Sequence, residues 1–328
     1  MRIATFNTEN LGSDGSGAPL EDRLAVLRPQ LLRLRADILC LQEVNGQLDK
    51  ESGKRRLKAL DRLIAGTPYQ DFHLVSTTGV SGTGARDRHN LAILSRFPIS
   101  FHQQIIHDLI HPPSYRGVTA DPPPKEAEEV TWERPFLACS VPLPGGRTLH
   151  VVNLHLRAPR AAFIPGQKNS STVWRTVPGW AEGFFLAVMK RAGQALEVRL
   201  FIDQMFDEDP DTLIVVAGDF NSEVYDIPVR MIRGDEEDTG NGALMRRMLI
   251  PLEHSLPDSR RYSVIHSGRP LMLDHLLASQ ALMSWYRTAE IHNEALGDEM
   301  ATPAVVSGAP ESYHAPMVAE FQFPGEEP

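Results

Sequence analysis

The sequence predicts an α/β protein of the α+β type, a four-layer α/β/β/α sandwich in which helices cover two mixed β-sheets that pack face to face. Two observations predict this class. Short apolar runs typical of buried strands alternate with segments of helical periodicity along the 328 residues. The chain also repeats one arrangement, a strand ending in polar residues, then a helix, then a buried strand ending in an acid. Two such units indicate two packed sheets.

The first unit lies at the N-terminus. Residues 2–7, RIATFN, alternate in polarity as a half-buried strand does. Leucines recur at helical spacing from Leu20 to Leu34, and Pro29 must either kink this helix or begin its second part. Residues 37–44, DILCLQEV, are apolar on both faces until their polar end, so we expect a fully buried strand.

A helix is expected over residues 54–65, followed by the strands DFHLVST and NLAILSR with a glycine-rich loop between them. Long irregular loops are expected at about 107–131 and 158–182, which are rich in proline, glycine or serine. Loops of this length on a regular scaffold are where a fold of this kind varies its specificity.

The second unit follows the first of these loops. The strands PFLACSV and TLHVVNLHL precede a helix expected at about 183–206, and the buried strand DTLIVVAGD ends in Asp219. An acidic loop, GDEEDTGNG, and the strands LDHLLAS and PMVAEFQF complete the chain. Because no change in composition marks a boundary, we expect one domain over residues 1–328.

The composition is that of a soluble globular protein, with 42% hydrophobic and 23% charged residues. The net charge of −9 argues against a surface that grips nucleic acid by charge alone, although it leaves open an enzyme that meets phosphate locally, through a metal. Cys40 and Cys139 lie in apolar runs and are predicted to be buried. We see no signal peptide, membrane span or obligate protein partner, so a cytoplasmic location is expected.

Polar side chains end several of the apolar strands, where a charged group needs a partner or a metal. Carboxylate and asparagine oxygens are hard ligands suited to Mg²⁺ or Mn²⁺, and the spacing of histidines and cysteines is not that of a zinc site. A histidine paired with a carboxylate can take or give a proton. These groups suit the attack of water on phosphorus. They are Asn7, Glu43, His155, Asp219, Asn221, Asp274 and His314.

Six motifs occur in the order and spacing of one superfamily: TFNTEN, LQEV, NLHL, GDFNSE, LDHLLAS and SYHAP. Each motif alone is a weak signal, but the six together, from Asn7 to His314, are specific. On these motifs the chain resembles the endonuclease/exonuclease/phosphatase superfamily, whose members have the DNase I-like fold. The resemblance implies a phosphoesterase that depends on a divalent metal.

The resemblance also implies roles for individual residues. Asn7 and Glu43 match the residues that bind the metal in that family. Asp219 and Asn221 match a pair that flanks the reacting phosphate, and His155 matches a histidine that stabilises or protonates it. The acid of LDH, Asp274, would pair with His314, the general base or transition-state stabiliser.

One position departs from the family pattern. The family usually ends in Ser-Asp-His, whereas this chain has Ser312, Tyr313 and His314. The missing aspartate commonly contributes to the metal region, and a phenol with a pKa near 10 is a poor ligand for Mg²⁺. Tyr313 could instead donate a hydrogen bond to a phosphate oxygen.

Other polar residues have two interpretations. Arg157 and Arg160 either hold phosphate or are solvated loop residues, and Asn90 either approaches the substrate or does not. The remaining candidates are interpreted more plainly: His107 and His111 as loop residues, and the acidic run at 235–238 as a solvated surface. Three loop residues could stack on and hold a nucleotide: Lys168, Trp174 and Arg175.

The leading hypothesis is a Mg²⁺- or Mn²⁺-dependent phosphodiesterase, such as a nuclease, acting by attack of water on phosphorus. DNA, RNA, a nucleotide derivative, a phospholipid head group and a small phosphoester all remain open as substrates. Two alternatives are kept: a small-molecule or lipid phosphomonoesterase of the same fold, and a non-catalytic phosphate-binding module, which the tyrosine at position 313 favours.

Overall fold

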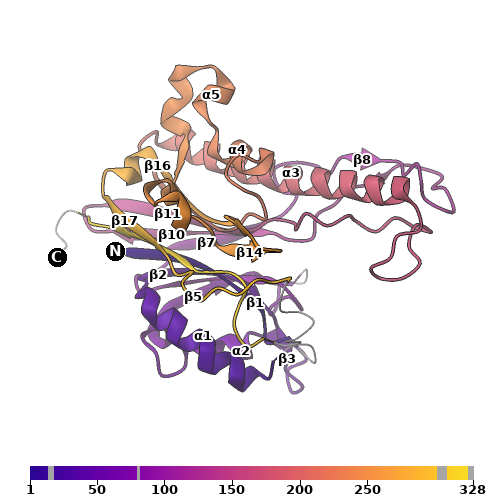
Figure 1. The fold of residues 1–328 in the computed structure, drawn as a ribbon. Helices are drawn as coiled ribbons and strands as arrows, with labels where there is room; N and C mark the ends of the chain where they lie inside the picture. The colour runs from indigo at the N-terminus through magenta and orange to yellow at the C-terminus, as the bar shows by residue number, and fades with distance from the viewer. Residues whose placement is uncertain (14–17, 80–81, 301–308, 324–328) are drawn as a thin grey trace.

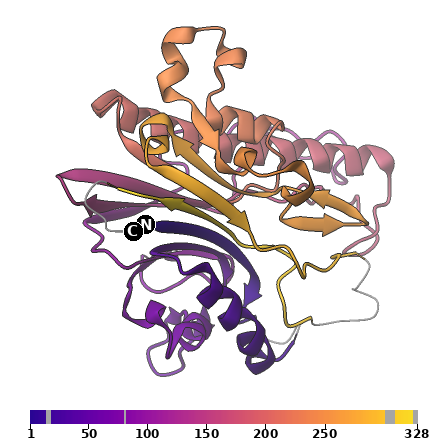
Figure 2. The same ribbon diagram turned by 60° about the vertical axis from the view of Figure 1, so that its left-hand side comes forward.

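The computed structural model describes residues 1–13, 18–79, 82–300 and 309–323 of the chain. Two six-stranded mixed sheets pack face to face, and helices cover their outer faces (Figures 1 and 2). This arrangement is the four-layer sandwich that the sequence predicts. The N-terminus lies beside the end of β18, the last described strand, where the amino group of Met1 donates to the carbonyl of Phe321.

The first sheet contains the N-terminal strands and both C-terminal ones. Its strand order is β17 (Tyr286–Ile291), β18 (Met317–Phe321), β1 (Arg2–Leu11), β2 (Ile38–Val44), β6 (Asn90–Ser95) and β5 (His73–Ser76). The second sheet has the order β13 (Leu249–Pro251), β16 (Asp274–Ser279), β12 (Leu213–Asp219), β11 (Arg147–His155), β10 (Phe136–Leu143) and β7 (Phe101–Ile105).

The two repeated units of the sequence occupy equivalent places in the two sheets. In the first, β1 and β2 are parallel and α1 (Leu20–Leu34) connects them; in the second, β11 and β12 are parallel and α3 (Val177–Glu208) connects them. Parallel strands end at the same edge of a sheet. The ends of all four strands therefore meet at one rim of the sandwich.

Shorter elements fill the loops. The helices are α2 (Lys58–Ile64), α4 (Ile227–Arg233), α5 (Glu236–Thr239) and α6 (Gln280–Met283), with 3₁₀ turns at Pro68–Asp71, Gly242–Arg247, Leu252–Ser255 and Asp258–Arg260. Three small hairpins pair β3 (Gln47–Leu48) with β4 (Arg55–Arg56), β8 (Ser114–Tyr115) with β9 (Glu128–Glu129), and β14 (Val264–His266) with β15 (Arg269–Leu271).

Apolar side chains from both sheets fill the space between them, and a further apolar layer lies under the helices on each outer face. Cys40 and Cys139 both lie in the central layer as free, buried thiols, as predicted. Gln42 and Asn153 also lie in the interior, where they bond to each other across the sheets at 2.7 Å, so that neither amide is left without a partner.

The start of α3 was predicted wrongly. The helix begins at Val177 rather than near residue 183, so the second long loop ends six residues earlier than expected. Thr176 caps the helix by accepting the amide of Gly179, and Pro178 lies in the first turn, where its missing N–H costs nothing. Position 183 of this helix requires glycine because the preceding loop packs closely against it. A Cβ there would lie 2.5 Å from the carbonyl of Ala162.

Smaller differences concern the ends of elements. The helix expected from residue 54 begins at Lys58, because Arg55 and Arg56 pair with β3. The acidic loop contains the short helix α5, and α1 continues through Pro29 as one helix. The strands β7, β13 and β17 were not foreseen; each lies at the edge of its sheet and is short or polar, which weakens the alternation that marks a strand.

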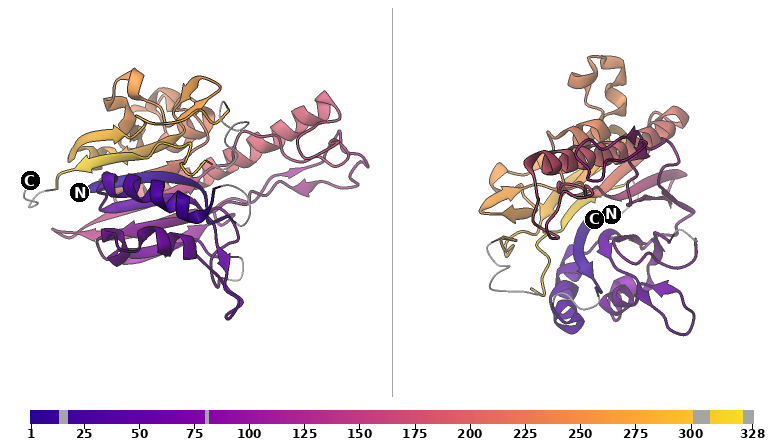
Figure 3. Two further views of the ribbon diagram at one scale, coloured as in Figure 1. Left: turned by 60° about the horizontal axis from the view of Figure 1, so that its bottom comes forward. Right: turned by 90° about the vertical axis from the view of Figure 1, so that its right-hand side faces the viewer.

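The N-terminal half of α3 extends beyond the sheets, together with the hairpin β8–β9 (Figure 3). Two glutamates of α3 fix the proline-rich loop to this helix. Glu182 accepts the amides of Val118 and Thr119, and Glu197 accepts the amides of Asp108 and Leu109. The expected loop at about 107–131 is therefore irregular but anchored. In the described part of the chain, no helix is both long and apolar enough to cross a membrane.

The packing between the sheets gives a test of the fold. Ile93 lies completely buried on β6 in the central layer, so Ile93→Ala should lower the free energy of unfolding by about 2–5 kcal/mol. Leu32→Ala, on the exposed face of α1, should change it by no more than about 0.5 kcal/mol. Urea unfolding followed by circular dichroism measures both; equal losses in the two variants would contradict the predicted packing.

Candidate active site

The strand register brings polar side chains from both sheets to the same rim. His155 ends β11 and pairs with Asp219, which ends β12; Asp219 in turn pairs with Asp274, which begins β16. Asn7 of β1 and Glu43 of β2 lie at the corresponding edge of the first sheet. Gly218, just before Asp219, has a φ of 148°, and a Cβ there would lie 2.0 Å from the carbonyl of Leu154. Only glycine allows β11 and β12 to approach so closely at this edge.

Asp219 has the most contacts of these side chains and is 2% exposed. One carboxylate oxygen accepts Asn7 Nδ2 at 3.0 Å and Asn221 Nδ2 at 3.1 Å, and it lies 3.2 Å from His155 Nε2. The other oxygen accepts the amide of Asn221 at 2.8 Å. Burial opposes the charged form, but His155, the charge of His314 and the backbone amide of Asn221 outweigh it and hold the pKa of Asp219 below its usual range. Asp219 is therefore ionised at neutral pH.

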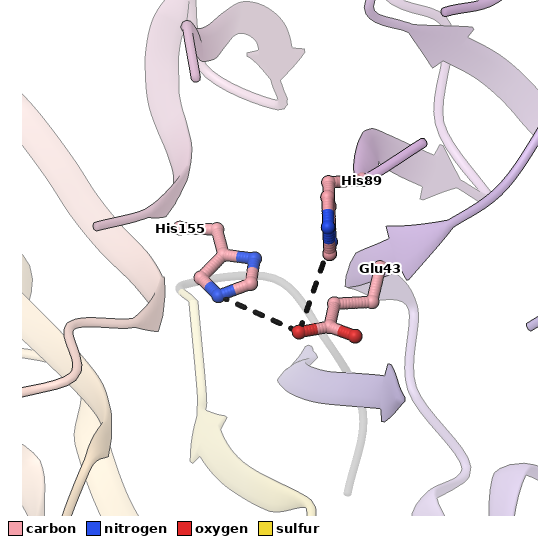
Figure 4. A group of neighbouring side chains, drawn as sticks. All are labelled: Glu43, His89 and His155. Atoms are coloured by element: carbon pink, nitrogen blue, oxygen red, sulfur yellow. Dashed lines mark ion pairs between the residues drawn. The ribbon is translucent and has the colours of Figure 1, made fainter. Parts of the chain in front are cut away.

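Glu43 faces two imidazoles (Figure 4). Its Oε1 lies 3.7 Å from His155 Nε2 and 3.9 Å from His89 Nδ1, and its Oε2 accepts the amide of Asn10 at 3.0 Å. Burial raises the pKa of Glu43, but His155, His89 and the nearby Arg134 lower it by a larger amount. The net shift of this pKa is downward. Burial and the charge of Arg134 lower the pKa of His89 to about 4, which leaves its ring neutral.

His314 and Asp274 form the pair that the sequence predicts. His314 Nδ1 lies 2.8 Å from Asp274 Oδ2, and the backbone amide of Asp274 donates to Ser263 Oγ at 3.0 Å. Burial opposes charge on His314, but the carboxylates of Asp274, Asp219 and Glu43 outweigh it and raise the pKa of His314 well above its ordinary value. At neutral pH His314 is therefore an imidazolium, which suits an acid or a stabiliser of negative charge better than a base.

Tyr313 lies at the same rim, and a carboxylate lies beside it. The backbone amide of Tyr313 donates to Glu9 Oε2 at 2.7 Å. Burial raises the pKa of Glu9, a residue that the sequence did not single out. Glu9 reaches this position because β1 bulges between Asn7 and Leu11, and Arg23 holds the bulge by donating to the carbonyl of Glu9 at 2.6 Å.

A cleft of about 780 Å³ opens over these groups. Its floor carries most of the predicted side chains, and its walls carry four arginines: Arg134, Arg157, Arg160 and Arg191. The Nε atoms of Arg157 and Arg191 are buried without a hydrogen-bond partner within the described residues. Carboxylates line the cleft as well, and one of them, Glu133, lies 3.5 Å from Arg157 Nη1. The arginines still offer guanidinium donors, and the size of the cleft suits a phosphate ligand larger than phosphate alone.

The remaining candidates lie elsewhere. Asn90 is completely buried and does not line the cleft; its amide contacts the backbone of Val44 and Arg86. His107 contacts the carbonyl of Trp132 and makes no metal cluster with His111 in the described chain. Three loop candidates lie outside the cleft: Lys168 stacks on Trp174, and Arg175 pairs with Asp121.

Sequence reasoning missed His89, Glu9 and Arg134. His89 directly precedes Asn90, and Glu9 lies two residues after Asn7, so both are adjacent to predicted positions. Their φ angles, 55° for His89 and 48° for Glu9, turn the side chains away from the strand alternation on which the prediction rests. No local signal marks Arg134, which reaches the cleft through the fold of its loop.

Comparison with known proteins identifies the family and the fold. The model of the Endonuclease/Exonuclease/phosphatase family matches residues 4–295. Among curated proteins, none matches the sequence.

Several solved structures share the fold at low identity. A mannosyl-6-phosphatase from Bacteroides thetaiotaomicron has a TM-score of 0.57 and 14% identity, with 98% of this chain and 100% of that chain covered. A 3′ phosphatase from Neisseria, bound to a product DNA hairpin, has a TM-score of 0.52 and 18% identity over the same shares. Truncated Caenorhabditis elegans TDP2 has a TM-score of 0.54 and 14% identity, with 98% of each chain covered.

The raised pKa of His314 predicts how stability depends on pH. A group whose pKa is raised on folding stabilises the fold fully below its unfolded pKa, about 6.5, and loses this effect as pH rises through the folded pKa. The wild type should therefore exceed His314→Gln in stability most at pH 6, and the difference should shrink toward pH 9. Urea unfolding in EDTA measures it. His111→Gln, at an exposed histidine, is the control; a constant difference for His314→Gln would contradict the assignment.

Proposed function

The chain belongs to the endonuclease/exonuclease/phosphatase family, and on this premise we propose that it is a phosphoesterase dependent on Mg²⁺ or Mn²⁺ that hydrolyses phosphodiester bonds. The observation that carries the proposal is the convergence of two systems at one cleft. An ionised Asp219 lies beside a protonated His314, and Glu43 presents a carboxylate oxygen to the same space. In this proposal Asp219 and His314 transfer protons, and the Glu43 carboxylate attracts a cation.

The donor atoms at the rim fit a divalent ion. Glu43 Oε1 faces His89 and His155 at distances too long for hydrogen bonds, whereas Oε2 is occupied by the amide of Asn10. Asn7, the second expected ligand, uses its Nδ2 on Asp219 and its Oδ1 on the amide of Glu9. Glu43 is thus the better supported ligand, and the role of Asn7 stays a prediction. A bound ion would polarise a phosphoryl oxygen and offset its charge.

The chain's own residues supply the remaining chemistry. Asp219, Asp274 and His314 present ligand atoms within 4.8 Å of one another. In the proposed reaction Asp219 orients a water molecule and accepts its proton as the oxygen attacks phosphorus. His314, charged because of Asp274, stabilises the phosphoryl oxygens or donates a proton to the departing oxygen, so that the P–O bond to the leaving group breaks.

Three further residues prepare Asp219 for this role. Asn7 and Asn221 fix the orientation of its carboxylate, and His155 keeps it ionised. The expected contact of Asn221 and His155 with phosphate stays a prediction. Catalysis by such a site depends mainly on groups that are already in place before the substrate arrives.

Activity against a simple diester tests the proposal. The protein should hydrolyse bis(p-nitrophenyl) phosphate with Mn²⁺ or Mg²⁺ and lose activity in EDTA. Glu43→Gln and His314→Ala should each lower kcat/KM by about 10²-fold or more, because each removes charge stabilisation in the transition state. Glu237→Gln, on the exposed surface, serves as the matched control. Full activity in EDTA, or unchanged turnover in both site variants, would refute the proposal.

The arginines of the cleft predict how the substrate is held. Arg157 lines the cleft, and its Nε is buried without a hydrogen-bond partner among the described residues. Arg157→Ala should raise KM several-fold with little change in kcat, since binding in the ground state and the transition state is lost alike. Arg96→Ala, beyond the opposite end of the strands, is the control. A loss confined to kcat would contradict a purely binding role for Arg157.

The compared structures share only the fold with this chain, so the size and charge of the cleft are the guide to the substrate class. These structures include a 3′ phosphatase bound to DNA and a mannosyl-6-phosphatase. The acidic net charge disfavours a long nucleic-acid track, so a short nucleic-acid end, a nucleotide derivative or a small phosphoester fits a cleft of this size better. Rates on plasmid DNA, RNA, nucleotides, lipid head groups and sugar phosphates, measured side by side, separate these classes and include the monoesterase alternative.

A second candidate function is a non-catalytic phosphate-binding module, because Tyr313 stands where the family usually has aspartate. It predicts that Mn²⁺ or phosphate raises the melting temperature while no phosphoester is consumed. Tyr313→Asp would then create activity that the wild type lacks. Turnover by the wild-type protein would rule this candidate out.

A further inference from the structure

Glu43 and His89 each present a polar atom whose hydrogen-bonding capacity is unused. Within the part of the chain that the structure describes, no donor contacts Glu43 Oε1, and His89 Nδ1 is buried with no hydrogen-bond partner. His155 Nε2 is the third atom of the group, and all three atoms lie within 4.8 Å of one another. Buried polar atoms are almost always paired, so this arrangement requires an explanation.

The distances favour a shared ion over direct contacts. The carboxylate oxygen lies 3.7 Å from one imidazole nitrogen and 3.9 Å from the other, and both distances exceed a hydrogen bond. Bonds from zinc to nitrogen or oxygen are about 2.0–2.2 Å long, so two ligands of one tetrahedral ion lie about 3.4 Å apart. The two distances from Glu43 Oε1 therefore exceed that spacing by a few tenths of an ångström, and the two imidazole nitrogens lie within 4.8 Å of each other.

The three side chains are held by the backbone around them rather than by one another. Glu43 and His89 have φ angles of 58° and 55°, which are costly for residues with a Cβ and are typical of sites under functional constraint. His155 is fixed at the end of a central strand and is 2% exposed. Both strained residues direct their side chains to the same place, which indicates that the backbone strain serves to position these two side chains.

Asn90 and Asn45 fix the turn that carries His89. Asn90 donates to the carbonyls of Val44 and Arg86, and Asn45 accepts the amide of His89 at 2.9 Å. Through these bonds the buried Asn90 positions His89, and the turn is held against the end of β2. Glu43 lies on β2 and His89 directly precedes the adjacent strand β6 of the same sheet, while His155 comes from the other sheet.

We propose that Glu43 Oε1, His89 Nδ1 and His155 Nε2 form a binding site for a borderline transition-metal ion such as Zn²⁺, Co²⁺ or Mn²⁺. Two imidazoles and one carboxylate favour these ions over Mg²⁺, which takes oxygen ligands and keeps its waters. The same three ligand types hold catalytic zinc with one position left for water or substrate, and the cleft lies on the open side here. The inference rests on the proposed function in treating Glu43 as a metal ligand. It also requires that His155 Nε2, which lies 3.2 Å from Asp219 Oδ2, give up its proton and that contact when the ion binds.

Direct binding to metal-stripped protein tests this site without any substrate. Calorimetric titration with Co²⁺, Zn²⁺ and Mg²⁺ should show tighter binding of the first two, and bound Co²⁺ should show visible absorption of nitrogen-ligated, four- or five-coordinate cobalt. His89→Gln should weaken Co²⁺ and Zn²⁺ binding by at least about tenfold and alter this absorption, with little effect on Mg²⁺. His102→Gln, at an exposed histidine of β7, should bind as the wild type does.

The outcomes separate this inference from the proposed hydrolysis. Unchanged Co²⁺ affinity and absorption in a folded His89→Gln protein would overturn the site even if Mg²⁺-dependent hydrolysis is present. Cobalt bound through His89 in a protein that hydrolyses no phosphoester would support the site and count against the function. If His89→Gln fails to fold, pulsed EPR of Mn²⁺ on the wild type decides: couplings to imidazole nitrogen support the site, and their absence overturns it.

Discussion

The buried carboxylate of Asp219 is the constraint on which the site depends. A charge enclosed at the end of a central strand is stable only if several donors surround it. Asn7 reaches it from the first sheet, and His155 and Asn221 reach it from the second. The Asp219 carboxylate thereby joins the edges of the two sheets, and it fixes the positions of the three polar side chains that contact it.

This requirement accounts for the strained backbone around the cleft. Glu43, His89 and Asn221 all have positive φ angles, although none is glycine. Each turns a side chain toward the rim instead of along the alternation of its strand, at a cost of about 1–3 kcal/mol per residue. The paired amides of Gln42 and Asn153 beneath the site, together with the apolar layer between the sheets, hold the strands rigidly enough to sustain that strain.

The sequence predicts the strand ends well because the signal there is local. An apolar run that stops at an acid or a histidine identifies Glu43, His155 and Asp219 without knowledge of any contact, and the repeated unit predicts the strand–helix–strand order of both halves. Arg134 and His89 could not be found in this way, since each enters the cleft from a loop whose path depends on tertiary contacts. The start of α3 was recognisable from Thr176 and Pro178, but the surrounding glycines and serines favoured a loop.

Tyr313 shows why a missing acid in the sequence does not imply a missing acid in the cleft. The loop that carries it is fixed to β1, since Ser312 donates to the carbonyl of Asn7 at 2.8 Å and the amide of Tyr313 donates to Glu9. That contact holds the Glu9 carboxylate at the rim, where it adds to the negative potential of Glu43. A carboxylate is therefore present at the rim although position 313 has no acid, and loss of function does not follow from the tyrosine alone.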